Sequence, residues 1–188
     1  MEGLTRLAVR AWGHFLDQVG DLVDVVAFYD DLGMQDRLLV SPAMYRRIIK
    51  PHHARVIAAI RQRTRAKVFF HSDGAVAEFI PDMIEIGIDF LNPVQVSAAG
   101  MEDTAALKRR YGKNIGFWGA ACDSQRVLPS GSLEDVRRES RRRIADLAPG
   151  GGFVFAPVHN IQNDVSGDKT VALYQTAREF GRYPIAGR

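Results

Sequence analysis

Five short apolar runs recur along the chain, and each is followed by a segment whose apolar residues have helical spacing. Short runs rich in β-branched and aromatic side chains are typical of β-strands. Their almost continuous apolar character favours parallel strands that are buried on both faces. The five predicted strands are Val23–Tyr29, Lys67–Phe70, Ile88–Leu91, Asn114–Trp118 and Phe153–Ala156.

The segments between these strands carry helix signals. The first has an apolar face running from Leu4 to Val19, which we expect to pack against the sheet rather than a membrane surface. Pro51 must kink or divide the helix that starts at Ser41-Pro42. Further helices are predicted over residues 75–86, over Glu102–Tyr111, after the capping box Ser132–Asp135 and over Asp168–Phe180. The alternation predicts an α/β fold of about five βα units with parallel strands.

Polar groups capable of binding metals or moving protons follow all five predicted strands. They are Asp30-Asp31, His71-Ser72-Asp73, Asn92–Gln95, Asp123–Gln125 and His159–Gln162. Parallel strands deliver their carboxyl ends to one face, so we expect these residues to converge on one site. A doubly wound open sheet and a barrel both fit the pattern. The glycine-rich turn of a dinucleotide-binding sheet is missing after the first strand.

Composition and charge are those of an ordinary globular domain. Of 188 residues, 25% are charged and 46% hydrophobic, and no composition shift divides the chain, so we predict a single domain over residues 1–188. The basic stretch Arg137–Arg143 lacks interleaved aromatics, which favours a solvated helix face over a nucleic-acid site. A single cysteine, Cys122, and the lack of a signal peptide or a membrane-length apolar segment predict a cytoplasmic protein with no membrane partner.

Longer stretches of the sequence resemble the uroporphyrinogen decarboxylase superfamily, and most of all its methyltransferase branch. The stretches are DDLGMQ (Asp30–Gln35), SPAMYRRIIKP (Ser41–Pro51), FFHSDG (Phe69–Gly74), IPDMIEIGIDFLNPVQ (Ile80–Gln95), FWGAACDSQRVLP (Phe117–Pro129) and LAPGGGFVFAPVHNIQ (Leu147–Gln162). The resemblance implies a (β/α)8 TIM barrel with its site at the carboxyl ends of the strands. Such a barrel needs eight strands. We therefore expect a partial barrel, its C-terminal portion with the first strands missing, that a second chain or a homo-oligomer completes.

The same resemblance implies a metal site. The methyltransferase branch carries zinc on a His-x-Cys motif and a distant cysteine, which fall on His71, Asp73 and His159 here. The chain thus departs from the thiolate pattern at two of three positions, but nitrogen and oxygen ligands still suit zinc or iron. The alternative is that both histidines are hydrogen-bonding residues of a polar pocket and that Asp73 caps the helix beginning near Ala75.

Other residues at the strand ends are candidates for catalysis or ligand binding. Either Asp30 or Asp31 is expected to face the site, as a base, an orienting group or a cation ligand, and a turn role competes with this. Together with His71 and His159 they form the predicted catalytic set. The predicted binding residues are Asn92, Gln95, Trp118, Asp123, Gln125, Asn160 and Gln162. Trp118 would floor a flat ligand, or else belongs to the core.

Three functions remain open at this stage. The first is transfer of a methyl group between a small-molecule donor or acceptor and a corrinoid cofactor carried by a partner protein. The second is decarboxylation of a porphyrinogen, which needs no metal or other cofactor. In that branch an arginine-rich substrate motif lies near the N-terminus, in a region that has no counterpart here. The third is a truncated, non-catalytic subunit or fragment.

Overall fold

The computed structural model describes residues 1–185, in which five parallel strands alternate with helices. The strands are β1 (Val25–Tyr29), β2 (Lys67–His71), β3 (Phe90–Val94), β4 (Gly116–Ala120) and β5 (Phe153–Ala156). The helices are α1 (Glu2–Val19), α2 (Pro42–Met44), the π-helix η1 (Tyr45–Ile49), α3 (Lys50–Arg61), the 3₁₀-helix η2 (Ala77–Phe79), α4 (Ile80–Glu85), α5 (Thr104–Tyr111), α6 (Val127–Ser130), α7 (Leu133–Leu147) and α8 (Gly167–Phe180).

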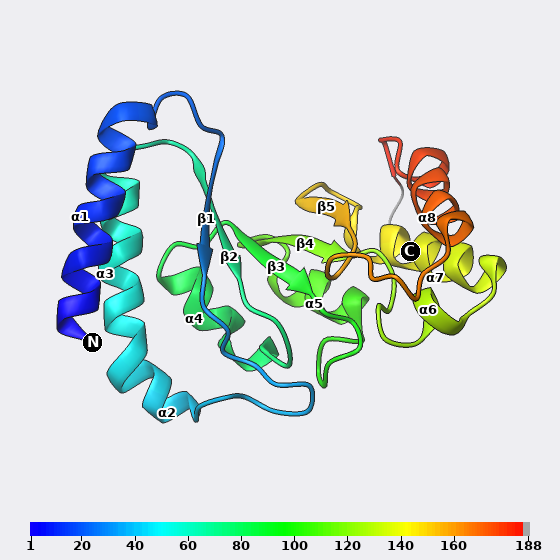
Figure 1. Ribbon diagram of the computed structural model, residues 1–188, viewed down its shortest axis with the longest axis horizontal. Helices are drawn as coiled ribbons and strands as arrows, with labels where there is room; N and C mark the ends of the chain where they lie inside the picture. Colours follow the sequence, from blue (N-terminus) through cyan, green and yellow to red (C-terminus); the bar gives the residue numbers. More distant parts are fainter. Residues whose placement is uncertain (186–188) are drawn as a thin grey trace.

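The strand order in the sheet is the order in the chain, β1-β2-β3-β4-β5, and every pairing is parallel. Figure 1 shows the strands fanning across the middle of the molecule, with α1 and α3 beyond β1 and with α7 and α8 beyond β5. Parallel neighbours joined by helical crossovers in sequence order are the pattern of a βα barrel. With five strands in place of eight, the described sheet is the expected partial TIM barrel.

The two faces of the sheet differ in burial. On the face that the helices cover, Val26, Phe70 and Phe117 are at most 3% exposed. On the other face, which we call the open face, Val25 is 39% and Tyr29 65% exposed. The open face also carries Phe69, His71, Phe90, Asn92 and Trp118, all half-buried. Parallel sheets are normally covered on both sides, so the open face is a surface that the five strands leave unfinished.

Helix α1 packs differently from the sequence expectation. It lies along α3 rather than on the sheet itself (Figure 1), and its buried residues are Thr5, Gly13 and Leu16. Leu4 and Leu7 of the predicted apolar face remain 73% and 63% exposed. The spacing correctly predicted a helix, but the spacing alone does not tell which neighbour covers it. No helix within residues 1–185 is long and apolar enough to cross a bilayer.

Pro51 widens its helix instead of breaking it. The Ser41 side chain accepts a hydrogen bond from the Met44 amide at the helix start, as expected of an N-cap. Immediately before Pro51 the helix adopts the π form, and the Lys50 amide bonds to the Tyr45 carbonyl five residues back. Proline lacks an amide hydrogen and crowds the preceding turn, so a wider turn relieves both problems without ending the helix.

Candidate functional site

The loops that follow β1 and β2 touch so closely that only glycine fits at their contact. Gly74 has φ +89°, and a Cβ atom there would lie 2.6 Å from the carbonyl carbon of Gly33 and from the carbonyl oxygen of Met34. The Ala75 amide donates to that same Met34 oxygen at 2.8 Å. The DDLG and HSDG motifs are therefore two halves of one contact, and this contact sets the positions of the acidic residues beside it.

Asp31, His71 and Asp73 come together at this contact. Each offers a ligand atom, and the three atoms lie within 4.8 Å of one another. His71 Nε2 is 4.0 Å from Asp31 Oδ1 and 3.5 Å from Asp73 Oδ2. Asp31 Oδ1 also accepts a hydrogen bond from the Asp73 amide at 3.0 Å. We call these three residues the His–Asp trio.

Asn92, on the neighbouring strand β3, orients the imidazole of His71. Its Nδ1 lies 2.7 Å from Asn92 Oδ1, while Asn92 Nδ2 donates to the Trp118 carbonyl at 3.4 Å. Because the amide oxygen of Asn92 can only accept, Nδ1 of His71 donates to it, which leaves Nε2 facing the two aspartates. Metal-ligating histidines are commonly fixed by such a partner. Asn92 therefore orients the imidazole of His71, in addition to lining a cleft.

The trio fits a divalent metal ion in both chemistry and spacing. One imidazole nitrogen and two carboxylates suit zinc, iron or manganese. Two ligand atoms placed tetrahedrally about 2.1 Å from zinc would be about 3.4 Å apart, close to the separation of His71 and Asp73. The capping alternative for Asp73 has no counterpart in the described hydrogen bonds, because the next helix, η2, has Val76 at its N-cap position and no side-chain cap.

His159 lies apart from the trio but lines the same mouth. Two clefts open at the carboxyl ends of the strands, and residues 158–161 of the β5 loop line both. The inner cleft, over the open face, is lined by Tyr29, His71, Asn92, Trp118, Ala156, Pro157, Val158, His159, Asn160, Ile161 and Tyr174. The outer cleft, of about 320 Å³, is lined by Asp73, Gln95, Ser124, Gln125, Leu128, Val158, His159, Asn160, Ile161, Gln162, Asp164 and Val165. Tyr29 and His159, 130 positions apart in sequence, thus line one cleft, because parallel strands bring their carboxyl ends to the same edge of the sheet.

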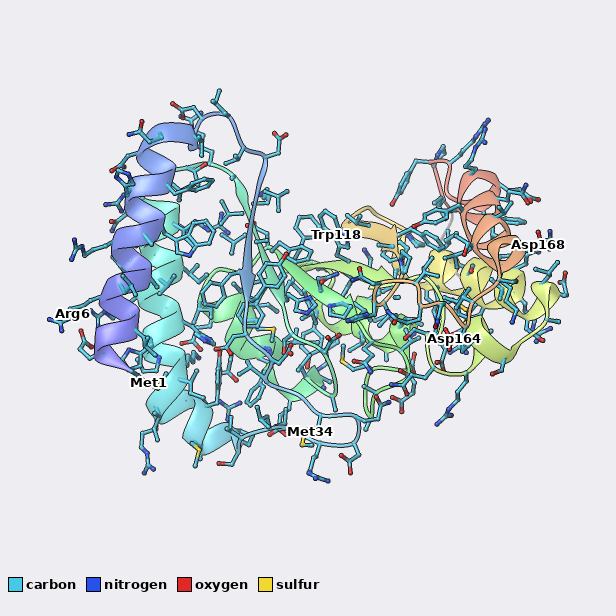
Figure 2. All side chains as sticks on the ribbon, viewed as in Figure 1. Met1, Arg6, Met34, Trp118, Asp164 and Asp168 are labelled. Atoms are coloured by element: carbon cyan, nitrogen blue, oxygen red, sulfur yellow. The ribbon has the colours of Figure 1, made fainter. Side chains whose placement is uncertain are left out.

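Most predicted binding residues therefore surround the two clefts. Trp118, which is labelled in Figure 2, belongs to the open face, where its ring meets those of Phe69 and Phe90 edge-on at 5.0 and 6.0 Å. Tyr29 extends this aromatic surface and was not foreseen as a site residue, although it ends the first predicted strand. The open face therefore combines aromatic rings that stand at steep angles to one another with the polar side chains of His71 and Asn92.

Three glutamines tie the rim loops together. Gln35 Oε1 accepts from Gln95 Nε2 at 2.8 Å and from Gln125 Nε2 at 2.9 Å, and the oxygen of Gln95 accepts from the Gly74 amide at 2.7 Å. Gln35 also donates to the Ser97 carbonyl. The sequence reading missed Gln35, although it ends the DDLGMQ stretch. Gln95 is buried and holds the loops, and both Gln95 and Gln125 line the outer cleft.

Asp30 and Asp31 point apart, as consecutive residues at a strand end should. Asp30 turns away from the trio toward α3, where His53 Nε2 meets its Oδ2 at 2.9 Å. His53 is 4% exposed and its Nδ1 lies 3.3 Å from the hydroxyl of fully buried Tyr45. His53 is not among the residues that the sequence predicts for the site. A usable signal existed, since His53 shares the helical stripe of Val56, Ile57 and Ile60, the buried face of α3.

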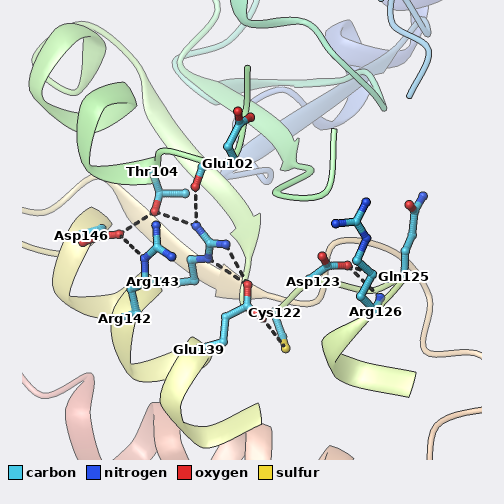
Figure 3. A network of polar contacts seen from close by, with 10 residues as sticks. All are labelled: Glu102, Thr104, Cys122, Asp123, Gln125, Arg126, Glu139, Arg142, Arg143 and Asp146. Atoms are coloured by element: carbon cyan, nitrogen blue, oxygen red, sulfur yellow. Dashed lines mark hydrogen bonds and ion pairs between the residues drawn. The ribbon is translucent and has the colours of Figure 1, made fainter. Parts of the chain in front are cut away.

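The contacts of Asp123 and Cys122 indicate structural roles for both residues (Figure 3). Asp123 Oδ1 accepts from the Gln125 and Arg126 amides, so it caps the turn before α6 and does not line either cleft. Burial and the neighbouring Glu139 carboxylate raise the pKa of the Cys122 thiol, which opposes nucleophilic use. Arg143 of the basic stretch is buried and donates to Glu139 and to the Glu102 carbonyl (Figure 3). Arg143 is therefore not part of the solvated helix face that the sequence predicts.

Comparisons with known proteins agree with this architecture. The model of the uroporphyrinogen decarboxylase family matches residues 4–180. A solved structure, a methyltransferase from Methanosarcina mazei, superimposes with a TM-score of 0.69 at 19% identity, which establishes likeness of fold. That match covers 93% of this chain and 48% of the other, so the chain spans about half the length of the solved protein. A search of curated protein sequences finds no match.

Proposed function

The chain belongs to the uroporphyrinogen decarboxylase family, and from that premise we propose that it forms the metal-binding part of a methyltransferase. The reaction would move a methyl group between a small molecule and a corrinoid carried by a partner protein. The observation that carries the proposal is the His–Asp trio beside the aromatic open face. It combines a charged, metal-capable group with aromatic side chains against which a cofactor can pack.

In this proposal the His–Asp trio binds the metal, and the cleft residues bind the small molecule and transfer protons. His71, Asp31 and Asp73 would hold zinc or iron, which when bound supplies a Lewis acid at the rim. Asn92 keeps the donor nitrogen of His71 aimed at that position. His159, which lines both clefts, would take or give a proton at the mouth. Asn160 and Gln162, on the same loop, offer hydrogen bonds to a polar methyl donor or acceptor.

The open face suggests a second partner, a polypeptide segment that completes the barrel. β1 pairs only with β2 and β5 only with β4 among the described residues, so both outer edges carry free backbone groups. We infer that a further polypeptide segment with the three remaining βα units closes the barrel over Tyr29 and Trp118, either as a second chain or in an oligomer. Closure would convert the exposed aromatic surface into the wall of an enclosed site.

Decarboxylation of a porphyrinogen is the second candidate. A substrate with several carboxylates needs cationic groups around it, as carboxylates pair best with arginine. Among the described residues that line the two clefts, none is arginine or lysine, whereas Asp73 and Asp164 add negative charge. The cleft charge therefore favours methyl transfer, and a cationic segment would have to come from the completing polypeptide. A non-catalytic subunit is the third possibility, and the same experiments separate it.

Metal content tests the proposal. The chain purified after growth with zinc and iron should contain close to one equivalent of metal by elemental analysis, and His71→Ala should lose most of it. His52→Ala is the matched control, since His52 contacts Thr5 and not the trio. The assembled protein should convert cob(I)alamin to methylcobalamin with a methylated small molecule, as followed by absorbance. A metal-free chain, or full activity of His71→Ala in the assembly, would eliminate this mechanism.

A further inference from the structure

A buried hydrogen-bonded chain connects the π-helix to the rim. It runs from the Tyr45 hydroxyl through His53 to the Asp30 carboxylate, over distances of 3.3 and 2.9 Å. Tyr45 and His53 are almost entirely buried, while the Asp30 side chain is 52% exposed. The imidazole also packs against Phe28 and Phe70. A polar residue buried in such surroundings is costly unless both nitrogens are satisfied, and here both are.

The direction of this chain is fixed by the tyrosine. Burial and the carboxylates of Asp82 and Asp30 raise the pKa of Tyr45, so its hydroxyl stays protonated. The hydroxyl can then donate to Nδ1 of His53, which leaves the Nε2 proton to bond Asp30. The π-helix places Tyr45 for this contact, and π turns often mark functional positions. The arrangement holds the Asp30 carboxylate from the side opposite to the clefts.

We propose that His53 is a positioning residue for Asp31. Asp30 and Asp31 are consecutive, so holding the carboxylate of one fixes the backbone from which the other projects. The loop that contains Asp31 is thereby clamped on two sides. His53 holds it from α3, and the glycine contact with Gly74 holds it from β2. The metal aspect of this inference rests on the proposed function, but the positioning itself does not.

The Asp73 amide reports the position of Asp31 directly, because it donates to Asp31 Oδ1. His53→Phe keeps the ring that packs on Phe28 and removes both nitrogens. We expect the Asp73 amide to exchange with solvent about tenfold faster in this variant, as measured by amide-resolved NMR. Its Co²⁺ affinity, measured by calorimetry, should fall about tenfold, since partners that orient ligands commonly change metal affinity by this amount.

Four control variants and one reporter amide separate positioning from general destabilisation. His52→Phe changes the neighbouring residue of the same helix and should leave both readouts unchanged. His53→Gln can keep a donor toward Asp30 and should restore slow exchange. Asp30→Ala should speed exchange as much as His53→Phe, and the double variant should add nothing further, because both remove one contact. Exchange at the buried Leu107 amide of α5 monitors global opening.

The outcomes distinguish this inference from the proposed function. If the Asp73 amide exchanges equally in wild type and His53→Phe, or if the Leu107 amide accelerates equally, His53 has no positioning role and the inference is overturned. If the wild-type chain binds no Co²⁺ but exchange changes as expected, positioning stands and the metal-dependent mechanism fails. If Co²⁺ binds and its affinity is the same in His53→Phe, the loop does not control the trio.

Discussion

Replacing Gly74 with alanine tests whether the close loop contact builds the site. Two costs follow from the geometry. A side chain at φ +89° is strained by about 1–2 kcal/mol. The new methyl would also lie 2.6 Å from backbone atoms of Gly33 and Met34, which cannot rotate away as a flexible side chain would. Forcing the loops apart should add about 2 kcal/mol, in the range of other overpacking substitutions.

The total of about 3–4 kcal/mol should lower Tm by about 6–16 °C in a domain of this size. Gly150→Ala provides the matched control, because Gly150 has φ +76° and no atom within 4 Å of an added Cβ. It should carry the strain alone, at about 1–2 kcal/mol. Denaturant unfolding of both variants gives the difference. Equal free energies of unfolding for the two would show that the loops do not need this close approach.

Three further predictions concern orientation, acid stability and a buried ion pair. Asn92→Leu should weaken Zn²⁺ binding by about 10–100-fold in calorimetry, because His71 loses the acceptor that fixes its tautomer; unchanged affinity would contradict that role. Burial alone would raise the pKa of Asp82, but hydrogen bonds from Arg46 and Lys50 outweigh it and lower the pKa below its ordinary value of 3.8. The resulting stability is complete above about pH 4 and is lost as the pH falls further, so acid should lower the Tm of wild type more steeply than that of Asp82→Asn. Arg143→Ala should cost about 3 kcal/mol in denaturant unfolding, the lower end for a broken buried pair, because it leaves the half-buried Glu139 without its ion-pair partner, whereas exposed Arg137→Ala should change little.

The strands and their shared rim could be predicted because they depend on local pattern. β5 has the predicted bounds, and the capping box at Ser132 is present in full. β3 extends past the predicted end at Leu91, through Asn92-Pro93 to Val94. Proline fits there because the register with β4 shifts between Leu91 and Val94, so the missing amide hydrogen falls at an irregularity of the ladder.

The trio and its supports depend on contacts between distant loops, and the pattern of one segment cannot show these. Nothing around Asp31 indicates that its carboxylate bonds the Asp73 amide, since this follows from the fit of Gly33 against Gly74. Burial of Arg143 had a local signal that we did not use. Arg143 lies seven residues after Val136 and directly before Ile144, on the apolar stripe of α7.

Sequential strand order has a consequence for how the chain acquires its structure. Each strand pairs with the strand immediately before it in the chain, so each βα unit can dock on a unit that has already been synthesised. A growing polypeptide can therefore form the sheet one strand at a time, without closing one long loop. The rim is different, because the Asp31 loop is made early and the His159 loop late. Intermediates on the ribosome would therefore have an ordered scaffold before they have a complete reaction centre.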